Sequence, residues 1–510
     1  MLLVRLAETS ASVAATGSRK EKTHYLATVV ADLRSDEIEA AVGFLVGAPR
    51  QGSLGVGWAT VTRLEVDPAT DASLEVNDLD TLLAQIAVTA GPGSGQARAE
   101  LLTDFLARAT PSEHDFVRRI LIGDLGQGAL QGVVADAVAI AASVKPALLR
   151  RAAMLEGDLG RAALIALTEG AEALSEVSLR VGRPIQPMLA STAADVETAV
   201  AAFGRAQVEW KLDGARIQLH VEGERVAVYT RNLNPVTDRL PHIVELARSW
   251  PCRSAILDGE VLGFFGDDEP QPFQNTMSAF GTQNEAGPVA APSPAAHLRP
   301  FFFDLMLLDG ISLIDQPLWE RSAALEALVG PLRIPSIVTD SAEAGAAHLA
   351  SALSNGHEGV MVKAVDGRYE AGRRGKSWLK VKPVHTLELV VLAAEWGHGR
   401  RRGWLSNLHL GARDPDSGEL LMVGKTFKGL TDDLLRWQTE QFLARKIGED
   451  ASGHTVYVAP DLVVEIALDG AQRSTRYPGG VALRFARVKG YRPDRSAATA
   501  DTIDAVRALL

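Results

Sequence analysis

One lysine, Lys211, stands between Trp210 and Leu212 in an apolar run typical of a buried strand end, before Asp213 and Gly214 turn the chain. Burying an ammonium costs free energy, so a lysine among apolar neighbours generally has a partner or a chemical task. After losing its proton, such a lysine is a nucleophile. The alternative is a structural lysine whose stem lies along the strand. This stretch alone favours the structural alternative.

Other residues suited to binding or catalysis stand at the ends of predicted strands in the same part of the chain. Two are the carboxylates Glu260 and Glu358. The remaining candidates are Glu209, Arg216, Arg231, Phe303, Lys363, Arg374, Lys380 and Lys382. Each charged residue alone fits a strand-end salt bridge or an exposed charge. Together, basic groups and carboxylates from separate strands predict a polyphosphate pocket with a divalent metal site.

A glycine-rich stretch, Gly372-Arg373-Arg374-Gly375-Lys376-Ser377, has a superficial likeness to a P-loop. A P-loop has four residues between its glycines, whereas this stretch has two. No buried strand is predicted to lead into it, and no helix to follow it. These differences argue against a P-loop ATPase.

The composition is that of an ordinary globular protein, with 510 residues, 46% hydrophobic and 23% charged. This length suggests about three domains at roughly 150 residues each. No apolar run approaches the ~20 residues of a membrane span, and no signal peptide is expected. The single cysteine, Cys252, excludes a disulfide framework and a Cys-rich zinc site, so a cytoplasmic location is expected.

The net charge of −11 argues only mildly against a nucleic-acid partner, because binding depends on local patches. Basic residues gather near the C-terminus, at Arg400-Arg401-Arg402, at Lys425 with Lys428, and between Arg484 and Arg495. The C-terminal part is therefore the favoured place for a phosphate-binding face.

Hydrophobic periodicity divides the chain into parts. Residues 1–175 are predicted to be helical, and 176–187, with two prolines, to be a linker. Residues 188–384 should alternate strands and helices, with a mobile surface loop at 285–296. The predicted strands are 208–212, 217–221, 226–230, 255–262, 300–308, 359–364 and 378–381, and the predicted helices 193–203, 241–248, 319–329 and 342–355.

Short strands dominate residues 385–510. They are predicted at 387–394, 408–412, 420–426, 461–467 and 481–488, with one helix at 432–444. Five short strands and one helix fit a small Greek-key barrel of the OB type.

Several motifs now stand in a recognisable order. Lys211-Leu212-Asp213-Gly214-Ala215-Arg216 matches the nucleotidyltransferase pattern K-x-D-G-x-R. The others are Thr230-Arg231-Asn232, Asp258-Gly259-Glu260, Phe303-Asp304-Leu305, Glu358-Gly359-Val360-Met361-Val362-Lys363, Trp378-Leu379-Lys380-Val381-Lys382 and Arg484-Phe485-Ala486-Arg487-Val488. The chain resembles ATP-dependent DNA ligases of the bacterial and archaeal type, related to eukaryotic replicative ligases.

The resemblance extends to the helical part, where Leu121-Ile122-Gly123-Asp124-Leu125 is similar to a family segment. Gly126 stands where the family often has arginine, which puts one phosphate contact in doubt. Ala486 replaces a proline common in the last motif. The resemblance implies a multidomain fold: an all-α DNA-binding domain at 1–175, an α+β nucleotidyltransferase domain with ATP-grasp-like antiparallel sheets at 188–384, and a β-barrel OB domain at 385–510.

The resemblance also implies a function in DNA replication, repair or recombination. Lys211 would carry AMP, which passes to the 5′-phosphate of nicked double-stranded DNA and is then displaced by the 3′-hydroxyl. Phe303 and Glu209 would hold the base, and Arg216 and Arg231 the phosphate and ribose. Arg374, Lys380 and Lys382 would neutralise phosphates, and Lys363 would bind the nucleotide. Glu260 and Glu358 would organise Mg²⁺, with Mn²⁺ as an alternative, and Glu260 would also border the nucleotide. A monomer without membrane contact is expected.

Other enzymes share the lysine signature. An mRNA capping guanylyltransferase or an RNA ligase would not account for the helical residues 1–175. NAD-dependent DNA ligases usually carry a four-cysteine zinc module, which one cysteine cannot form. The non-enzymatic alternative is a DNA-binding protein with a degenerate ligase core. The intact Lys211, Glu260, Glu358 and Lys380 argue against it.

Overall fold

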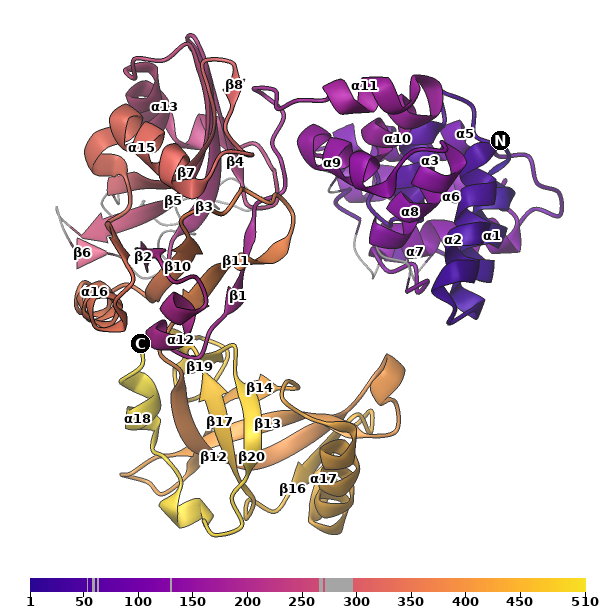
Figure 1. Cartoon of the computed structure of the whole chain (residues 1–510). Helices are drawn as coiled ribbons and strands as arrows, with labels where there is room; N and C mark the ends of the chain where they lie inside the picture. The colour runs from indigo at the N-terminus through magenta and orange to yellow at the C-terminus, as the bar shows by residue number, and fades with distance from the viewer. Residues whose placement is uncertain (53, 57–59, 62–63, 129–130, 266–268, 271–296) are drawn as a thin grey trace. The chain divides into compact units, whose positions relative to one another are not determined.

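The computed structural model describes every residue except 53, 57–59, 62–63, 129–130, 266–268 and 271–296. The loop expected at 285–296 therefore lies outside the described residues. The chain forms two compact units, Met1–Val381 and Lys382–Leu510 (Figure 1).

The part predicted to be helical, 1–175, is mainly helical among its described residues, and its helices share one apolar core. Among the described residues, no single helix meets the length and hydropathy of a membrane span; the helices Gln131–Ala141 and Pro146–Glu156 do so only as a pair bent by 120°. The helices are α1 Leu3–Ala15, α2 Arg19–Ala31, α3 Ile38–Leu45, α5 Val76–Val88, α6 Ser94–Leu106, α7 Pro111–Ile122, α8 Gln131–Ala141, α9 Pro146–Glu156, α10 Leu159–Thr168 and α11 Gly170–Glu176.

Helix α7 shows how local sequence sets these boundaries. Thr110 and Glu113 form a capping box at its start, and Pro111 occupies the first turn, where no intrahelical amide bond is lost. At the other end, Gly123 adopts a left-handed conformation, with φ 75°, that terminates the helix. Phe116 and Ile120 lie on its buried face.

A five-stranded sheet forms one half of the strand-rich part of the first unit, in the order β1-β11-β10-β2-β9. These strands are β1 Leu189–Thr192, β11 Arg374–Val381, β10 Gly359–Ala364, β2 Ala206–Lys211 and β9 Ser336–Thr339. The strand pairs β11-β10, β10-β2 and β2-β9 are antiparallel, as expected, and β1 pairs with β11 in parallel at the edge. Helices α12 Val196–Ala201 and α16 Ala342–Ser354 pack on the outer face through the core around Val208 and Val360.

A six-stranded sheet forms the other half, in the order β4-β3-β5-β7-β8, with β6 paired to β5. The strands are β3 Ala215–Glu222, β4 Arg225–Thr230, β5 Ser254–Phe265, β6 Glu269–Pro270, β7 His297–Leu308 and β8 Ile311–Ser312. Helices α13 Pro241–Arg248 and α15 Leu318–Val329 cover this sheet (Figure 1). Between the two sheets lies a core that includes Ile256, Met306, Tyr369 and Trp378.

Most predicted elements of this region are present, with shifted ends. The strand predicted at 378–381 begins at Arg374, and the strand at 255–262 runs to Phe265. The helix predicted at 193–203 begins three residues later, at Val196, because the Asp195 side chain accepts a hydrogen bond from the amide of Thr198 and caps the helix there. Strands β1 and β9 were not predicted, because each has only four residues.

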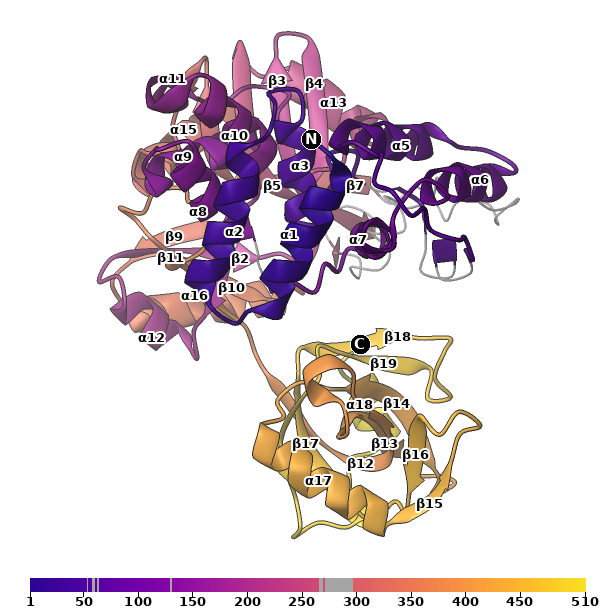
Figure 2. The same ribbon diagram turned by 90° about the vertical axis from the view of Figure 1, so that its right-hand side faces the viewer.

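The C-terminal unit contains a seven-stranded sheet. Its strands are β12 His385–Trp396, β13 Leu405–Arg413, β14 Leu420–Thr426, β15 Lys446–Glu449, β16 Thr455–Val458, β17 Val463–Leu468 and β20 Arg487–Tyr491. α17 Asp432–Ala444 packs against β13 and β16 (Figure 2). A hairpin of β18 Gly470–Arg473 and β19 Val481–Arg484, and the helix α18 Ile503–Arg507, complete the unit.

One strand expected in this unit needs correction. The strand predicted at 481–488 is broken at Phe485, whose φ of 54° interrupts an extended chain. Among the described strands, no hydrogen-bond ladder joins the two ends of the sheet, so the pairing does not establish the closed barrel.

Candidate nucleotide-binding site

Lys211 is the last residue of β2, and its ammonium forms an ion pair with Glu358. The register pairs Lys211 with Gly359 of β10, and the amide of Glu358 donates to the carbonyl of Lys211 at 3.0 Å. Trp210 packs on His357, with ring centroids 5.0 Å apart. The half-buried lysine is therefore held at a fixed place at the end of two paired strands.

Strand register places further predicted residues on the same face of this sheet. Residues directly opposite in adjacent antiparallel strands point to the same side, as do residues two apart in one strand. The row next to Lys211 contains Glu209, Met361 and Lys380. The following row contains Gln207, Lys363 and Trp378. Residues from three strands thus form one surface.

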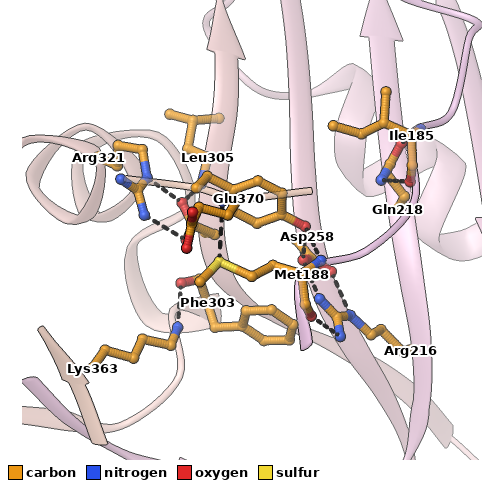
Figure 3. A network of polar contacts seen from close by, with 12 residues as sticks. Ile185, Met188, Arg216, Gln218, Asp258, Phe303, Leu305, Arg321, Lys363 and Glu370 are labelled. Carbon is orange, nitrogen blue, oxygen red and sulfur yellow. Dashed lines mark hydrogen bonds and ion pairs between the residues drawn. The ribbon is translucent and has the colours of Figure 1, made fainter. Parts of the chain in front are cut away.

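The six-stranded sheet contributes the facing surface. Arg216 on β3 lies opposite Glu260 on β5. The guanidinium of Arg216 reaches one rung further, to the buried Asp258, with Nε–Oδ1 at 2.9 Å and Nη2–Oδ2 at 2.6 Å (Figure 3). Its Nη1 also donates to the carbonyl of Met188 at 2.8 Å. Arg216 is therefore anchored by the protein before any nucleotide is considered.

Asp258 has a second partner in Tyr369, a buried residue of the segment between β10 and β11. The Tyr369 hydroxyl donates to Asp258 Oδ2 at 2.7 Å and accepts from the amide of Met188 at 3.1 Å. Burial and the neighbouring carboxylate raise the pKa of Tyr369 well above its ordinary value, so its hydroxyl stays a neutral donor. These contacts join three separate segments around Arg216.

Glu260 lies close to Lys211 and Arg216. Burial raises the pKa of Glu260 to about 8, although both cations favour its charged form. A carboxyl in such a position gains from a divalent cation. Among the described residues no group of three or more His, Cys, Asp or Glu could hold a metal ion. A Mg²⁺ ion often relies on one or two carboxylates plus substrate phosphates, which fits Glu260 and Glu358.

Phe303 on β7 projects into the space between the sheets. The guanidinium carbon of Arg216 lies 5.4 Å from its ring centroid, and the Trp378 ring meets it edge-on at 6.1 Å. The next residue, Asp304, forms a fully buried ion pair with Arg321 of α15, at 2.7 and 3.0 Å. This pair anchors the strand that carries Phe303.

The structure brings most of the predicted site residues together. The assembled residues are Glu209, Lys211, Arg216, Glu260, Phe303, Glu358, Lys363 and Lys380. Arg231 follows β4 and Arg374 begins β11, and both are exposed. Lys382 belongs to the C-terminal unit, where its ammonium forms an ion pair with Asp469.

Several residues that organise this site had no predicted role in it: Gln207, Asp258, Asp304, Arg321 and Tyr369. Asp258 could have been found, because it lies two residues before Glu260 and therefore on the same face of the strand. No sequence signal marked Tyr369 or Arg321 as a partner of a distant carboxylate.

Comparisons with known proteins identify the family. The model for the ATP dependent DNA ligase domain matches residues 187–382, the DNA ligase N terminus matches 61–139, and the ATP dependent DNA ligase C terminal region matches 401–495. A protein of Saccharopolyspora erythraea named "Probable DNA ligase" is 52% identical over 99% of this chain and 98% of its own length. The chain belongs to the ATP-dependent DNA ligase family.

A second member of this ligase family, the "Probable DNA ligase" of Rhodococcus jostii, is 52% identical over the full length of both chains. A solved structure named Pmar-Lig_PreS3 is 20% identical and superposes with a TM-score of 0.63 over 96% of this chain and 99% of its own. That likeness supports the shared fold. The chain is therefore a ligase enzyme with a helical N-terminal region, a β-rich nucleotidyltransferase region and a C-terminal sheet domain.

Proposed function

We propose that this ligase seals nicks in duplex DNA and that Lys211 carries AMP between ATP and the DNA end. The observation that carries the proposal is the position of Lys211 at the end of β2, paired with Glu358 and close to Arg216 and Glu260. An amine at the meeting point of a cation and two carboxylates suits transfer of a phosphoryl group.

The first step joins the lysine to the nucleotide. After losing a proton to solvent, Lys211 Nζ attacks the α-phosphorus of ATP. A P–N bond forms, the bond to the bridging oxygen breaks, and pyrophosphate leaves with that electron pair. In the second step, an oxygen of the 5′-phosphate at the nick attacks the same phosphorus and releases the lysine. The 3′-hydroxyl then attacks the 5′-phosphorus and expels AMP.

The other residues bind and orient the reacting groups. Arg216 retains donor capacity beyond its bonds to Asp258 and Met188, because a guanidinium has five N–H donors. Lys380 lies one row from Lys211 and suits a phosphate oxygen. Phe303 offers a ring for stacking on adenine. Exposed Arg231 and Arg374, and Lys382 of the C-terminal unit, are assigned to the nucleotide through the family resemblance.

Glu260 and Glu358 are the carboxylates proposed to hold Mg²⁺. When bound, this ion would neutralise phosphate charge and polarise the α-phosphate. We propose Mg²⁺ rather than Zn²⁺, because the ligands are oxygen atoms.

The finer domain assignments belong to the same proposal. Residues 1–175 would bind the DNA duplex, and 176–187 would link them to the next domain. Residues 188–384 would carry out adenylation, and 385–510 would form an OB-type barrel. The seven-stranded sheet of this unit and the helix α17 packed on it support the last assignment. We place the protein in the cytoplasm, on the nucleoid DNA, as a monomer.

Labelling with α-labelled nucleotide tests the proposal. The full chain with Mg²⁺ should become covalently labelled by ATP, and not by GTP or labelled NAD⁺, and should then seal a nicked duplex. Lys211→Ala should remain unlabelled. The control is Lys446→Ala, which removes an exposed lysine paired with Glu449 and should be labelled like the wild type. Labelling of Lys211→Ala at the wild-type level would refute the role of Lys211.

A further inference from the structure

Lys363 was predicted to join the cations of the phosphate pocket, but its surroundings are of a different kind. Its side chain is 1% exposed. The ammonium donates to the Phe303 carbonyl at 3.1 Å (Figure 3). It also lies 2.5 Å from Glu209 Oε2, 4.2 Å from the Trp378 ring centroid and 4.9 Å from that of Phe303. A primary ammonium has three donors. The three N–H donors of Lys363 are surrounded by protein groups, so few are left to bind a phosphate oxygen.

The partner of Lys363 is equally enclosed. The Glu209 side chain is 2% exposed, and its Oε1 accepts from Gln207 Nε2 at 2.5 Å. Gln207 Oε1 in turn accepts from Ser322 Oγ of α15 at 3.0 Å. A continuous chain of polar contacts therefore runs from α15 through β2 to Lys363 on β10, and ends on the carbonyl of Phe303.

Strand register separates Lys363 from the reacting lysine. Gly359 is the residue opposite Lys211, and Lys363 lies four residues further along β10, or roughly 13 Å at 3.3 Å per residue. Lys380 lies in the nearer row, opposite Met361. Because the P–N bond forms at Lys211, the α-phosphate must lie there, and the base must lie at the other end of the AMP group. Lys363 is thus placed at the base end.

We propose that Lys363 is a positioning residue for the nucleobase and makes no contact with phosphate. Its ammonium holds the Glu209 carboxylate and the backbone of Phe303 at a fixed separation, so that the Phe303 ring is ready to stack on adenine. Without Lys363, the buried carboxylate of Glu209 would have lost its cation. It would then have to take up a proton or move. This proposal rests on the proposed function, because it assumes that an adenine nucleotide occupies the site.

The test separates the base end from the phosphate end of the nucleotide. Lys363→Met keeps much of the side-chain volume but leaves Glu209 unpaired, so the double variant Lys363→Met/Glu209→Gln serves as a second form without the unpaired charge. Inhibition of self-adenylation by adenosine reports on the base end. Pyrophosphate reverses self-adenylation, and the concentration at which half of the adenylated enzyme has lost its AMP reports on the phosphate end.

In both variants we expect the inhibition constant of adenosine to rise at least tenfold, while the half-reversing pyrophosphate concentration changes less than twofold. Lys446→Met, in an exposed pair with Glu449, is the matched control and should leave both values unchanged. Weaker action of pyrophosphate with unchanged adenosine inhibition would overturn the proposal, as would an equal loss of both. Failure of the wild-type chain to become labelled would instead refute the proposed function.

Discussion

Arg216 and Asp258 form two parallel hydrogen bonds, 2.9 and 2.6 Å long, diagonally across β3 and β5. The arginine that the ligase motif assigns to the nucleotide is therefore already oriented by a carboxylate from another motif. Charge-assisted fork contacts of this kind fix direction as well as position. Part of the site is consequently assembled in the protein before a nucleotide enters.

Replacing Arg216 with lysine tests the importance of this fork. A lysine at this position would keep the positive charge but could not make both bonds to Asp258 and the bond to Met188. We expect the variant Arg216→Lys to form the lysyl-AMP at least tenfold more slowly at saturating ATP, as followed by transfer of labelled AMP. Arg248→Lys, at an exposed arginine whose Nε donates to the Glu224 carbonyl, should react like the wild type. An unchanged rate in Arg216→Lys would contradict the role of the fork.

Tyr369→Phe removes one hydroxyl from the same network. Asp258 Oδ2 and the amide of Met188 would each lose a buried hydrogen bond. We expect a loss of about 1–3 kcal/mol in the free energy of unfolding, seen as a fall of several degrees in the denaturation midpoint. Tyr229→Phe removes an exposed bond to Gly182 and should shift the midpoint less. Equal shifts in the two variants would mean that burial of the network does not matter.

The buried pair of Arg321 and Asp304 should be sensitive to loss of one partner. Both side chains are 0% exposed, so Arg321→Met would leave an uncompensated carboxylate in the core. Breaking such a pair typically costs about 3–5 kcal/mol of stability. The double variant Arg321→Met/Asp304→Leu should be more stable than Arg321→Met in thermal denaturation. A double variant destabilised by the sum of the two single changes would show that the charges do not interact.

The buried His220 is expected to make the stability of the folded protein sensitive to acid. Its Nδ1 accepts from the amide of Gly182 at 3.0 Å and its Nε2 donates to Gln218 Oε1 at 2.9 Å, so the buried ring is neutral. Burial lowers the pKa of His220 from 6.5 to about 3. Between these values the unfolded chain binds the proton and the folded chain does not. The stability that His220 contributes is therefore fully present above pH 6.5 and is lost as the pH falls towards 3.

Urea denaturation between pH 7 and pH 5 measures this effect. In this window His220 contributes a slope of up to about 1.4 kcal/mol per pH unit. His220→Gln lacks the titrating ring, so its stability should fall less steeply with decreasing pH. Some slope should remain, because burial also lowers the pKa of His357, to about 4. Identical slopes for His220→Gln and the wild type would rule out His220 as a source of acid sensitivity.

Local features were readable in the sequence because they depend on neighbouring residues. Alternating apolar residues predicted β3, β4 and β10. The pattern around Lys211 identified the reactive lysine candidate, and the ordered motifs indicated the ligase family, which the comparisons confirm. Short or irregular elements were missed, as at β1 and β9, or wrongly joined, as at Phe485, because few residues carry their signal.

By itself, then, the sequence determined the family, most of the strands and helices, and the kinds of side chain in the site. Only the tertiary structure decided which charged side chains pair with each other. Lys363 and Lys380 look alike in the sequence, yet the first is enclosed with Glu209 and the second is half-buried one row from Lys211. The partner of a buried charge is set by strand register and by which sheets face each other. Those relationships join residues that are far apart in the chain.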